Sequence, residues 1–143
     1  MNHIAIMKKS WGLTEKILSG EKKIESRWYE TRRAPWGRIR TGETVYFKNS
    51  GEPVTIKATV SKVLQLEGLT PRKVKALLVK YGRADGIERS KEHKFFKRFK
   101  NKKYCLLIFL KSPKKIKPFN IDKRGFGMMT AWISVKNINR IKR

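Results

Sequence analysis

The order of apolar and polar positions predicts a chain in which short helices interrupt a series of strands. Apolar side chains recur at helical spacing over residues 11–19, where Ser10 is the expected N-cap and Gly20 the expected stop. A second helix is predicted to begin at Thr70-Pro71, because threonine is a favoured N-cap and proline a favoured first helical residue. A further helical piece is predicted over residues 87–99.

Strands are predicted where apolar and polar residues alternate with a period of two. The longest such run covers residues 54–66. Alternation over residues 22–29 places Glu25, Arg27 and Tyr29 on one face of a strand and Trp28 on the face that enters the core. The remaining expected strands cover residues around 4–6, 43–49, 104–110, 116–119 and 131–138.

These elements define a fold class and a domain organisation. About five to seven strands with two or three flanking helices predict an α+β fold in which a strongly bent sheet closes on itself as a pseudo-β-barrel. The sequence contains no internal repeat and no linker rich in serine, glycine or proline. We therefore expect one domain over residues 1–143.

The charge of the chain indicates the kind of partner. It has 36 basic and 11 acidic residues, which gives a formal charge of +25, yet 39% hydrophobic and 10% aromatic residues are enough for a core. Residues 89–143 hold 18 basic residues but only Glu92 and Asp122 as acids, and aromatic residues lie among them. A lysine-rich thermophile surface is the alternative, but such surfaces match lysine with glutamate. Nucleic acid is the better explanation.

Several other classes are excluded or unsupported. A single cysteine, Cys105, rules out an internal disulfide, and no apolar run is long enough to span a bilayer. The first residues do not form a signal peptide, so we expect a cytoplasmic protein. His3 and His93 lie far apart without cysteine pairs or an acidic cluster, and no phosphate-binding glycine motif is present. We expect no metal, no cofactor and no membrane partner.

Residues 17–27, Ile-Leu-Ser-Gly-Glu-Lys-Lys-Ile-Glu-Ser-Arg, resemble the signature of the ASCH domain family within the PUA-like superfamily. In that signature a helix ends in a glycine, a lysine follows, and the next strand presents an acid or hydroxyl and an arginine. The run Gly-Glu-Thr-Val-Tyr-Phe over residues 42–47 and the valine-rich run 54–66 resemble later strands of the family. The resemblance implies a PUA-like pseudo-barrel with a cleft beside the first helix and second strand, in a family whose members bind RNA, cleave it or hydrolyse acyl groups from modified cytidine.

The three polar residues of this motif suit a cleft for one nucleotide. Lys22 offers a compact cation for phosphate or, if desolvated, a base or nucleophile. Arg27 offers a bidentate fork for phosphate or a base edge, and Glu25 an acceptor for an exocyclic amine. The simpler alternative is a surface network of Glu, Arg and Lys.

An RNA-directed enzyme is the second hypothesis, with Lys22 and Glu25 as catalytic residues. The acyl-cytidine hydrolases of the family use a lysine, a threonine three residues later and a more distant glutamate. Lys22 matches the lysine, but Glu25 occupies the threonine position and Leu77 lies near the third, with Glu67 as a nearby carboxylate. A ribonuclease or a modified-cytidine amidohydrolase would therefore need a rearranged Lys22/Glu25 pair.

The leading hypothesis is a monomeric RNA-binding module with a basic surface and a nucleotide-sized cleft. Trp11 is the residue expected to stack on a base, and Tyr29, on the same strand face as Arg27, could assist it. Trp36 lies on a basic loop, where it could stack on an unpaired base. Trp132 suits either a wall of the cleft or the core. The preference for RNA over single-stranded DNA rests only on the family resemblance. The third hypothesis is a basic module that takes part in protein assembly. The candidate nucleic-acid-binding residues are Lys9, Ser10, Trp11, Lys22, Lys23, Glu25, Arg27, Tyr29, Arg32, Arg33, Trp36, Arg38, Lys94, Lys97, Arg98 and Lys100.

Overall fold

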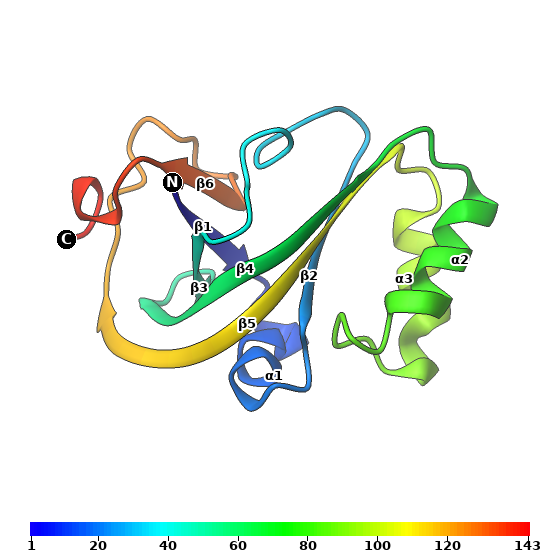
Figure 1. Ribbon diagram of the computed structural model, residues 1–143, viewed down its shortest axis with the longest axis horizontal. Coiled ribbons are helices and arrows are strands. Elements are labelled where there is room, and N and C mark those ends of the chain that lie inside the picture. The colour runs from blue at the N-terminus through cyan, green and yellow to red at the C-terminus, as the bar shows by residue number, and fades with distance from the viewer.

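The computed structural model describes residues 1–143 as one curled six-stranded sheet with three α-helices (Figure 1). The α+β pseudo-barrel prediction is confirmed. The strands are β1 (Asn2–Met7), β2 (Ile24–Tyr29), β3 (Thr44–Asn49), β4 (Val54–Leu66), β5 (Tyr104–Phe119) and β6 (Trp132–Val135). The helices are α1 (Leu13–Ser19), α2 (Pro71–Tyr81) and α3 (Glu92–Phe99), with 3-10 turns η1 (Lys9–Trp11), η2 (Arg89–Lys91) and η3 (Ile138–Arg140). None of the helices has the length and apolar character needed to cross a membrane.

The strand order β2-β5-β4-β3-β1-β6 leaves β2 at one edge of the sheet and β6 at the other. Only β1 and β3 pair in parallel, and the long strands β4 and β5 form the middle of the curl (Figure 1). The curl brings the two ends of the sheet together. There, Arg27 on β2 donates through Nη1 to the carbonyl oxygen of Ala131, just before β6, at 3.1 Å. We call this meeting line, between Arg27 on one side and Met7 and Ala131 on the other, the seam. Side chains close the seam instead of a ladder of backbone hydrogen bonds.

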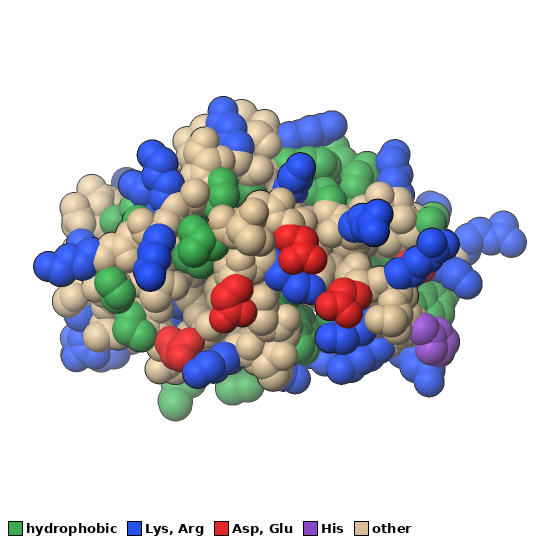
Figure 2. Space-filling view, turned by 90° about the horizontal axis from the view of Figure 1, so that it is seen from below, with side chains coloured by type: hydrophobic (Ala, Val, Ile, Leu, Met, Phe, Trp, Pro, Cys, Tyr) green, Lys and Arg blue, Asp and Glu red, His purple; other side chains and the backbone are tan.

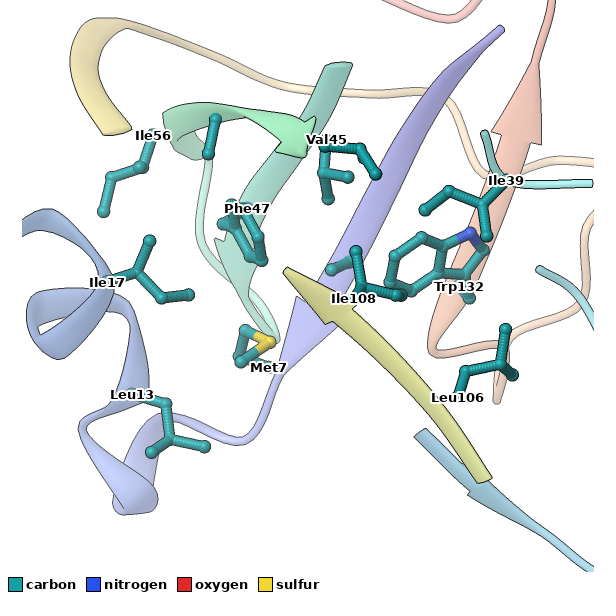
Figure 3. Close-up of a cluster of buried hydrophobic side chains, with 13 residues drawn as sticks. Met7, Leu13, Ile17, Ile39, Val45, Phe47, Ile56, Leu106, Ile108 and Trp132 are labelled. Carbon is teal, nitrogen blue, oxygen red and sulfur yellow. The ribbon is translucent and has the colours of Figure 1, made fainter. Parts of the chain in front are cut away.

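The main core fills the inside of the curl (Figure 3). The alternation predicted for residues 54–66 is confirmed in its first half, where Val54, Ile56, Ala58 and Val60 are all buried. Burying such side chains contributes about 1.5–3 kcal/mol each, so this face holds β4 in register.

A second core lies between the sheet and the helical pair α2–α3 at one end of the molecule (Figure 1). Val74 and Leu78 of α2 are buried there, and Thr70 caps the helix by accepting from the backbone N–H of Lys73 at 3.3 Å, as the sequence predicts. Trp28 of β2 stacks on Phe99 of α3 with ring centroids 4.8 Å apart, which fixes α3 beside the edge strand.

The first helix and the second strand begin later than predicted. The Ser10 cap prediction is wrong, because Ser10 lies within η1 and the left-handed Gly12 (φ 62°) separates that turn from α1. The strand predicted from residue 22 begins at Ile24, since the backbone N–H of Lys22 still bonds to the carbonyl of Lys16 at 2.9 Å. Lys22 therefore belongs to the turn between α1 and β2.

Three further boundaries differ from the prediction. The helix predicted over 87–99 begins only at Glu92, because Ile87 packs into the core and Glu88 is extended before η2. The two strands predicted over 104–110 and 116–119 are one strand, β5, which continues through register shifts because β4 pairs with it along its length. The last strand stops at Val135 instead of 138, where the Asn137 side chain caps η3.

Gly20 provides a test of how the turn before β2 is built. It ends α1 with φ 84°, and no atom lies within 4 Å of the place where a Cβ would be. Gly20→Ala should therefore lower the free energy of unfolding by about 1–2 kcal/mol through backbone strain alone. Gly20→Asn should cost less, because asparagine tolerates this conformation. Urea denaturation of both variants checks this, and an alanine variant as stable as the parent would contradict it.

Candidate functional site

A cavity of about 330 Å³ opens at the seam. Its floor comes from β2, one wall from the end of β1 and η1, and another from α3 and the residues after it. Trp11, Phe95 and Phe99 supply flat apolar surface, whereas Arg27, Arg98 and Lys102 supply positive charge. The cavity is therefore amphipathic, with aromatic walls and cationic groups that face the same space.

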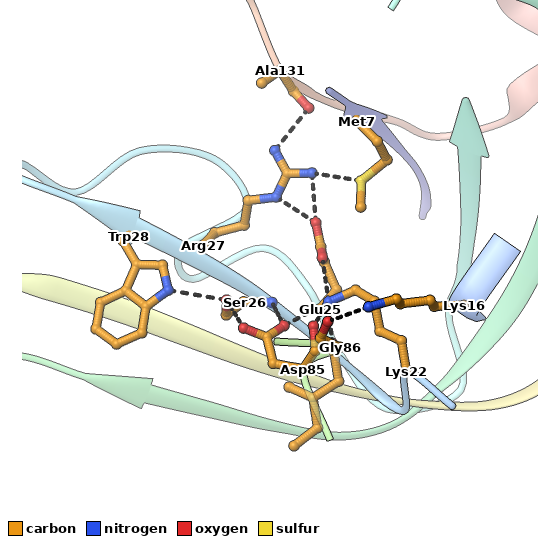
Figure 4. A network of polar contacts seen from close by, with 11 residues as sticks. Met7, Lys16, Lys22, Glu25, Ser26, Arg27, Trp28, Asp85, Gly86 and Ala131 are labelled. Atoms are coloured by element: carbon orange, nitrogen blue, oxygen red, sulfur yellow. Dashed lines mark hydrogen bonds and ion pairs between the residues drawn. The ribbon is translucent and has the colours of Figure 1, made fainter. Parts of the chain in front are cut away.

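The Lys22 ammonium lies below this cavity and is surrounded by oxygen atoms (Figure 4). Its Nζ donates to the carbonyl oxygen of Ile24, to the carbonyl oxygen of Asp85 and to Asp85 Oδ1, each at 2.6 Å, and lies 3.2 Å from Glu25 Oε1. Only 2% of the residue is exposed. An ammonium has three N–H donors, so none remains for a ligand.

Glu25 links Lys22 to the arginine of the motif. Its Oε2 accepts from Arg27 Nε at 2.9 Å and lies 2.6 Å from Arg27 Nη2, while Oε1 faces Lys22. Glu25 is 3% exposed. Both carboxylate oxygens are engaged, so the prediction that Glu25 accepts from an exocyclic amine does not fit this arrangement, and Glu25 orients Arg27 instead.

Asp85, in the loop after α2, covers the unpaired edge of β2. Its carboxylate accepts from the backbone N–H of Ser26 at 3.2 Å and from the Ser26 hydroxyl at 2.5 Å, and Trp28 Nε1 donates to that hydroxyl at 3.0 Å. Lys16 holds the same loop through the carbonyl of Gly86 at 2.9 Å. A side chain thus satisfies backbone groups that a neighbouring strand would otherwise bind.

The electrostatics of the cluster keep its cations charged. Burial penalises the charged form of Lys22, but the carboxylates of Asp85 and Glu25 outweigh it and hold the lysine pKa above its usual range. Burial alone would raise the pKa of Glu25, but Arg27 and Lys22 lower it. Burial raises the pKa of Asp85, so Asp85 is the first of the two carboxylates to take up a proton as the pH falls. Lys22 and Glu25 therefore form a fixed ion pair at neutral pH.

Arg27 has the most exposed of the charged side chains of this cluster, all of which line the cavity. Its guanidinium carbon lies 5.1 Å from the ring centre of Trp132, Nη1 donates to the Ala131 carbonyl, and Nη2 contacts Met7 Sδ at 3.4 Å. The side chain is 12% exposed. These contacts and the Glu25 pair leave one N–H of Nη1 without a protein acceptor.

Trp132, which the sequence leaves as either wall or core, is buried beneath Arg27. Its indole Nε1 donates to His3 Nδ1 at 3.2 Å, and His3 Nε2 therefore carries the proton that it donates to Glu43 Oε1 at 2.9 Å. Burial lowers the pKa of His3, although Glu43 opposes the shift. A neutral histidine thus anchors the tryptophan on which Arg27 rests.

Trp11 forms the wall opposite the seam. The guanidinium carbon of Arg98 lies 5.0 Å from its ring centre, and Phe95 packs edge-on at 5.3 Å. Arg98 makes no ion pair with an acid, so its charge is uncompensated at the cavity. An anionic group next to Trp11 would supply the missing partner.

The structure brings together some of the predicted site residues and not others. Those that line the cavity are Trp11, Lys22, Glu25, Arg27, Tyr29 and Arg98. Those that lie outside it are Lys9, Ser10, Lys23, Arg32, Arg33, Trp36, Arg38, Lys94, Lys97 and Lys100. Lys9 pairs with Glu52 at 2.8 Å on the surface, and Lys94, Lys97 and Lys100 project from the exposed face of α3.

Several cavity residues were not expected there from the sequence. They are Met7, Lys8, Ser26, Asp85, Phe95, Phe99 and Ala131. Phe95 and Phe99 lie within the helix predicted over 87–99, but periodicity does not show that they border a cavity. Asp85 carries no local signal, because only the packing of the loop after α2 brings it to Lys22.

Comparisons with known proteins identify the fold. No known protein family and no curated protein matches the sequence. The structure is similar to that of the ASCH protein of Zymomonas mobilis, with a TM-score of 0.67 and 18% identity over 94% of this chain and 87% of that one. A point mutant of the same protein gives a TM-score of 0.69 and 17% identity over 97% and 93% of the chains. The N-terminal domain of Staphylothermus marinus McrB gives 0.63 and 13% identity over 97% and 90%. The chain thus has the ASCH fold, which the motif at residues 17–27 implied.

Lys22 provides a test of the buried cluster. Lys22→Met removes the cation and leaves two buried carboxylates short of a partner, which should lower the free energy of unfolding by about 3–5 kcal/mol at pH 7. The loss should shrink as the pH falls, because burial raises the pKa of Asp85 and its protonation neutralises one of the two carboxylates. Urea denaturation at pH 7 and over a descending pH series measures this.

The exposed neighbour provides the matched control. Lys23→Met should change stability by no more than about 0.5 kcal/mol. A Lys22→Met protein as stable as this control would show that the cluster does not hold the site together.

Proposed function

We propose that this chain is an RNA-binding module of the ASCH family, which accepts one unpaired nucleotide in the cavity at the seam. The observation that carries the proposal is the Arg27 guanidinium, which Glu25 and Trp132 hold in one orientation with a free N–H at the cavity. An arginine fixed in this way can bind a base edge or a phosphate with little loss of side-chain entropy.

The shape and charge of the cavity support a nucleotide as its occupant. The ring of Trp11 in the cavity wall suits a base, since base–aromatic stacking contributes about 1–3 kcal/mol. Arg98 and Lys102 line the same cavity and suit the phosphate that accompanies the base. A purely apolar ligand would leave Arg98 without a partner.

The exposed face of α3 continues this positive region outward. Lys94, Lys97 and Lys100 are exposed, and none of them forms an ion pair. Arg98 of the same helix reaches the cavity, so phosphates that flank a bound nucleotide would meet α3 next.

In the view from below, carboxylates gather near the middle of the face while Lys and Arg project around them (Figure 2). Glu21, Glu88 and Glu92 belong to one shallow hollow, separate from the cavity.

The choice of RNA rests on the family resemblance. The motif at residues 17–27 and the likeness to ASCH structures favour a family whose members act on RNA, and the charge of +25 is compatible with any nucleic acid. The aromatic cavity favours single strands, whose bases are free to leave the stack.

The geometry favours binding over catalysis by Lys22. A lysine that acts as a base or nucleophile must lose its proton, and the acids around Lys22 raise its pKa. Its three N–H groups are also taken up by the carbonyl oxygens of Ile24 and Asp85 and by the Asp85 carboxylate, so none is left for a substrate. Lys22 is therefore a positioning residue in this proposal.

Binding to single-stranded RNA over a salt series tests the proposed function. We expect an affinity that falls steeply as salt rises, because bound phosphates release counterions from the RNA. Fluorescence anisotropy with a labelled oligonucleotide measures it, with a double-stranded RNA of the same length as the competitor. No binding, or binding that ignores salt, would refute the proposal.

Two sets of substitutions should separate the cavity from α3. Replacing Lys94, Lys97 and Lys100 by alanine should weaken binding to every RNA alike and reduce the salt slope by about two units. Arg27→Ala should change the slope by about one unit or less and should reduce discrimination among nucleotides, because a fixed fork at the base is lost. Equal slope changes with unchanged nucleotide preference in both would mean that surface charge alone accounts for binding.

A further inference from the structure

A pair of aromatic side chains lies outside the cavity, on the side where β2 and β5 meet the basic loop 30–42. Trp36 and Tyr104 pack edge to face with ring centroids 5.2 Å apart, and both are half-buried. The guanidinium carbon of Arg32 lies 5.6 Å from the centre of each ring. We call these three residues the platform.

Contacts with the sheet hold the platform in place. The Tyr29 hydroxyl donates to the carbonyl of Ala34 at 3.0 Å, and the backbone N–H of Gly37 donates to Gln65 Oε1 at 2.6 Å. Pro35 and Ile39 of the same loop are buried. A base that met the platform would therefore find a surface already formed, which lowers the entropic cost of binding.

The platform lies directly beside the cavity. Tyr29 lines the cavity and is the strand partner of Tyr104, so the two side chains share one face of the sheet, with Cβ atoms about 5 Å apart. Lys102 lines the cavity as well and precedes Tyr104 by two residues. The loop runs from the end of β2 toward β3 (Figure 1), and its Ala34, two residues before Trp36, accepts from the cavity-lining Tyr29.

The charge of the platform is available to a ligand. Arg32 pairs with Glu67 at 2.6 Å, but both side chains are more than half exposed, at 58% and 57%. An ion pair of this kind contributes about 0–1 kcal/mol and can exchange Glu67 for a phosphate. Arg33 and Arg38 of the same loop are exposed and form no ion pair.

We propose that Trp36, Tyr104 and Arg32 form a second base-binding subsite, which stacks the nucleotide adjacent to the one in the cavity. The ligand is then a single-stranded RNA of at least two nucleotides, with the phosphate between them near Lys102. The inference rests on the proposed function, because the first nucleotide occupies the cavity. It adds that recognition extends across Tyr29 to a second base.

The test compares three ligands: a uridine mononucleotide, a uridine dinucleotide, and the same dinucleotide with an abasic sugar at the second position. The abasic form keeps the phosphate between the sugars and removes only the base, so its affinity isolates stacking from charge. Isothermal titration should show that the second base strengthens binding about 5- to 150-fold, since stacking on an aromatic side chain contributes about 1–3 kcal/mol. Trp36→Leu and Tyr104→Leu should abolish most of this gain and leave mononucleotide affinity unchanged, whereas Trp36→Phe should keep part of it.

A second aromatic pair provides the matched control. Tyr46 and Phe119 also pack edge to face, at 5.8 Å, with Lys142 4.7 Å from the Phe119 ring centre, but they do not line the cavity. Phe119→Leu should keep the gain from the second base. Thermal unfolding by circular dichroism identifies any variant that fails to fold, and Tyr104→Leu then replaces Trp36→Leu.

The outcomes separate the two proposals. Binding of the mononucleotide without any gain from the second base would overturn the subsite and leave the cavity standing. An equal loss of the gain in Phe119→Leu and Trp36→Leu would also overturn it. If none of the ligands binds, and longer single strands do not bind either, the proposed function fails and the subsite with it.

Discussion

The burial of the Lys22 ammonium is the interaction on which the site depends. β2 lies at the edge of the sheet, so part of its backbone lacks a neighbouring strand, and Lys22 and Asp85 bind those groups in its place. The same ammonium joins the turn after α1, to which Lys22 belongs, to the loop after α2 and to Glu25 on β2. Glu25 in turn holds the Arg27 guanidinium, which closes the seam. The contact between Lys22 and Glu25 therefore sets the orientation of Arg27.

Two opposite physical demands meet at the seam. A curled sheet that closed through backbone hydrogen bonds would leave no opening, whereas two free strand edges would invite pairing with other chains. Here Arg27 crosses between the edges and rests on Trp132, which His3 anchors in turn. The seam is closed firmly enough to bury the core, yet it keeps a cavity in which Arg98 has no acidic partner.

The local features of this fold could be predicted from the sequence, and the long-range ones could not. Gly20 and Thr70 mark helix ends because their conformational preferences act within a few residues, and the alternation over Val54, Ile56, Ala58 and Val60 follows from one buried sheet face. Alternation also places Glu25 and Arg27 on one side of β2, where the structure shows them paired.

The same reasoning did not predict that Lys22 is buried against Asp85. A lysine next to a strand is usually solvated, and only the packing of the loop after α2 buries this one against an aspartate 63 residues away. Arg98 and Phe95 entered the cavity wall for a similar reason, because the stacking of Phe99 on Trp28 decides where α3 lies. Periodicity shows which face of a helix is buried, but it does not show which cavity that face borders.

The central claim is that Arg27, held by the buried cluster, meets a nucleotide against the wall that Trp11 forms. A ¹⁵N-edited NMR titration with an unlabelled uridine mononucleotide tests it directly, because Arg27 Nε–H and Trp11 Nε1–H give separate side-chain signals. The account predicts that both signals shift together and saturate at the same ligand concentration. It is contradicted if the nucleotide binds while both signals stay unchanged, or if only backbone signals of α3 respond.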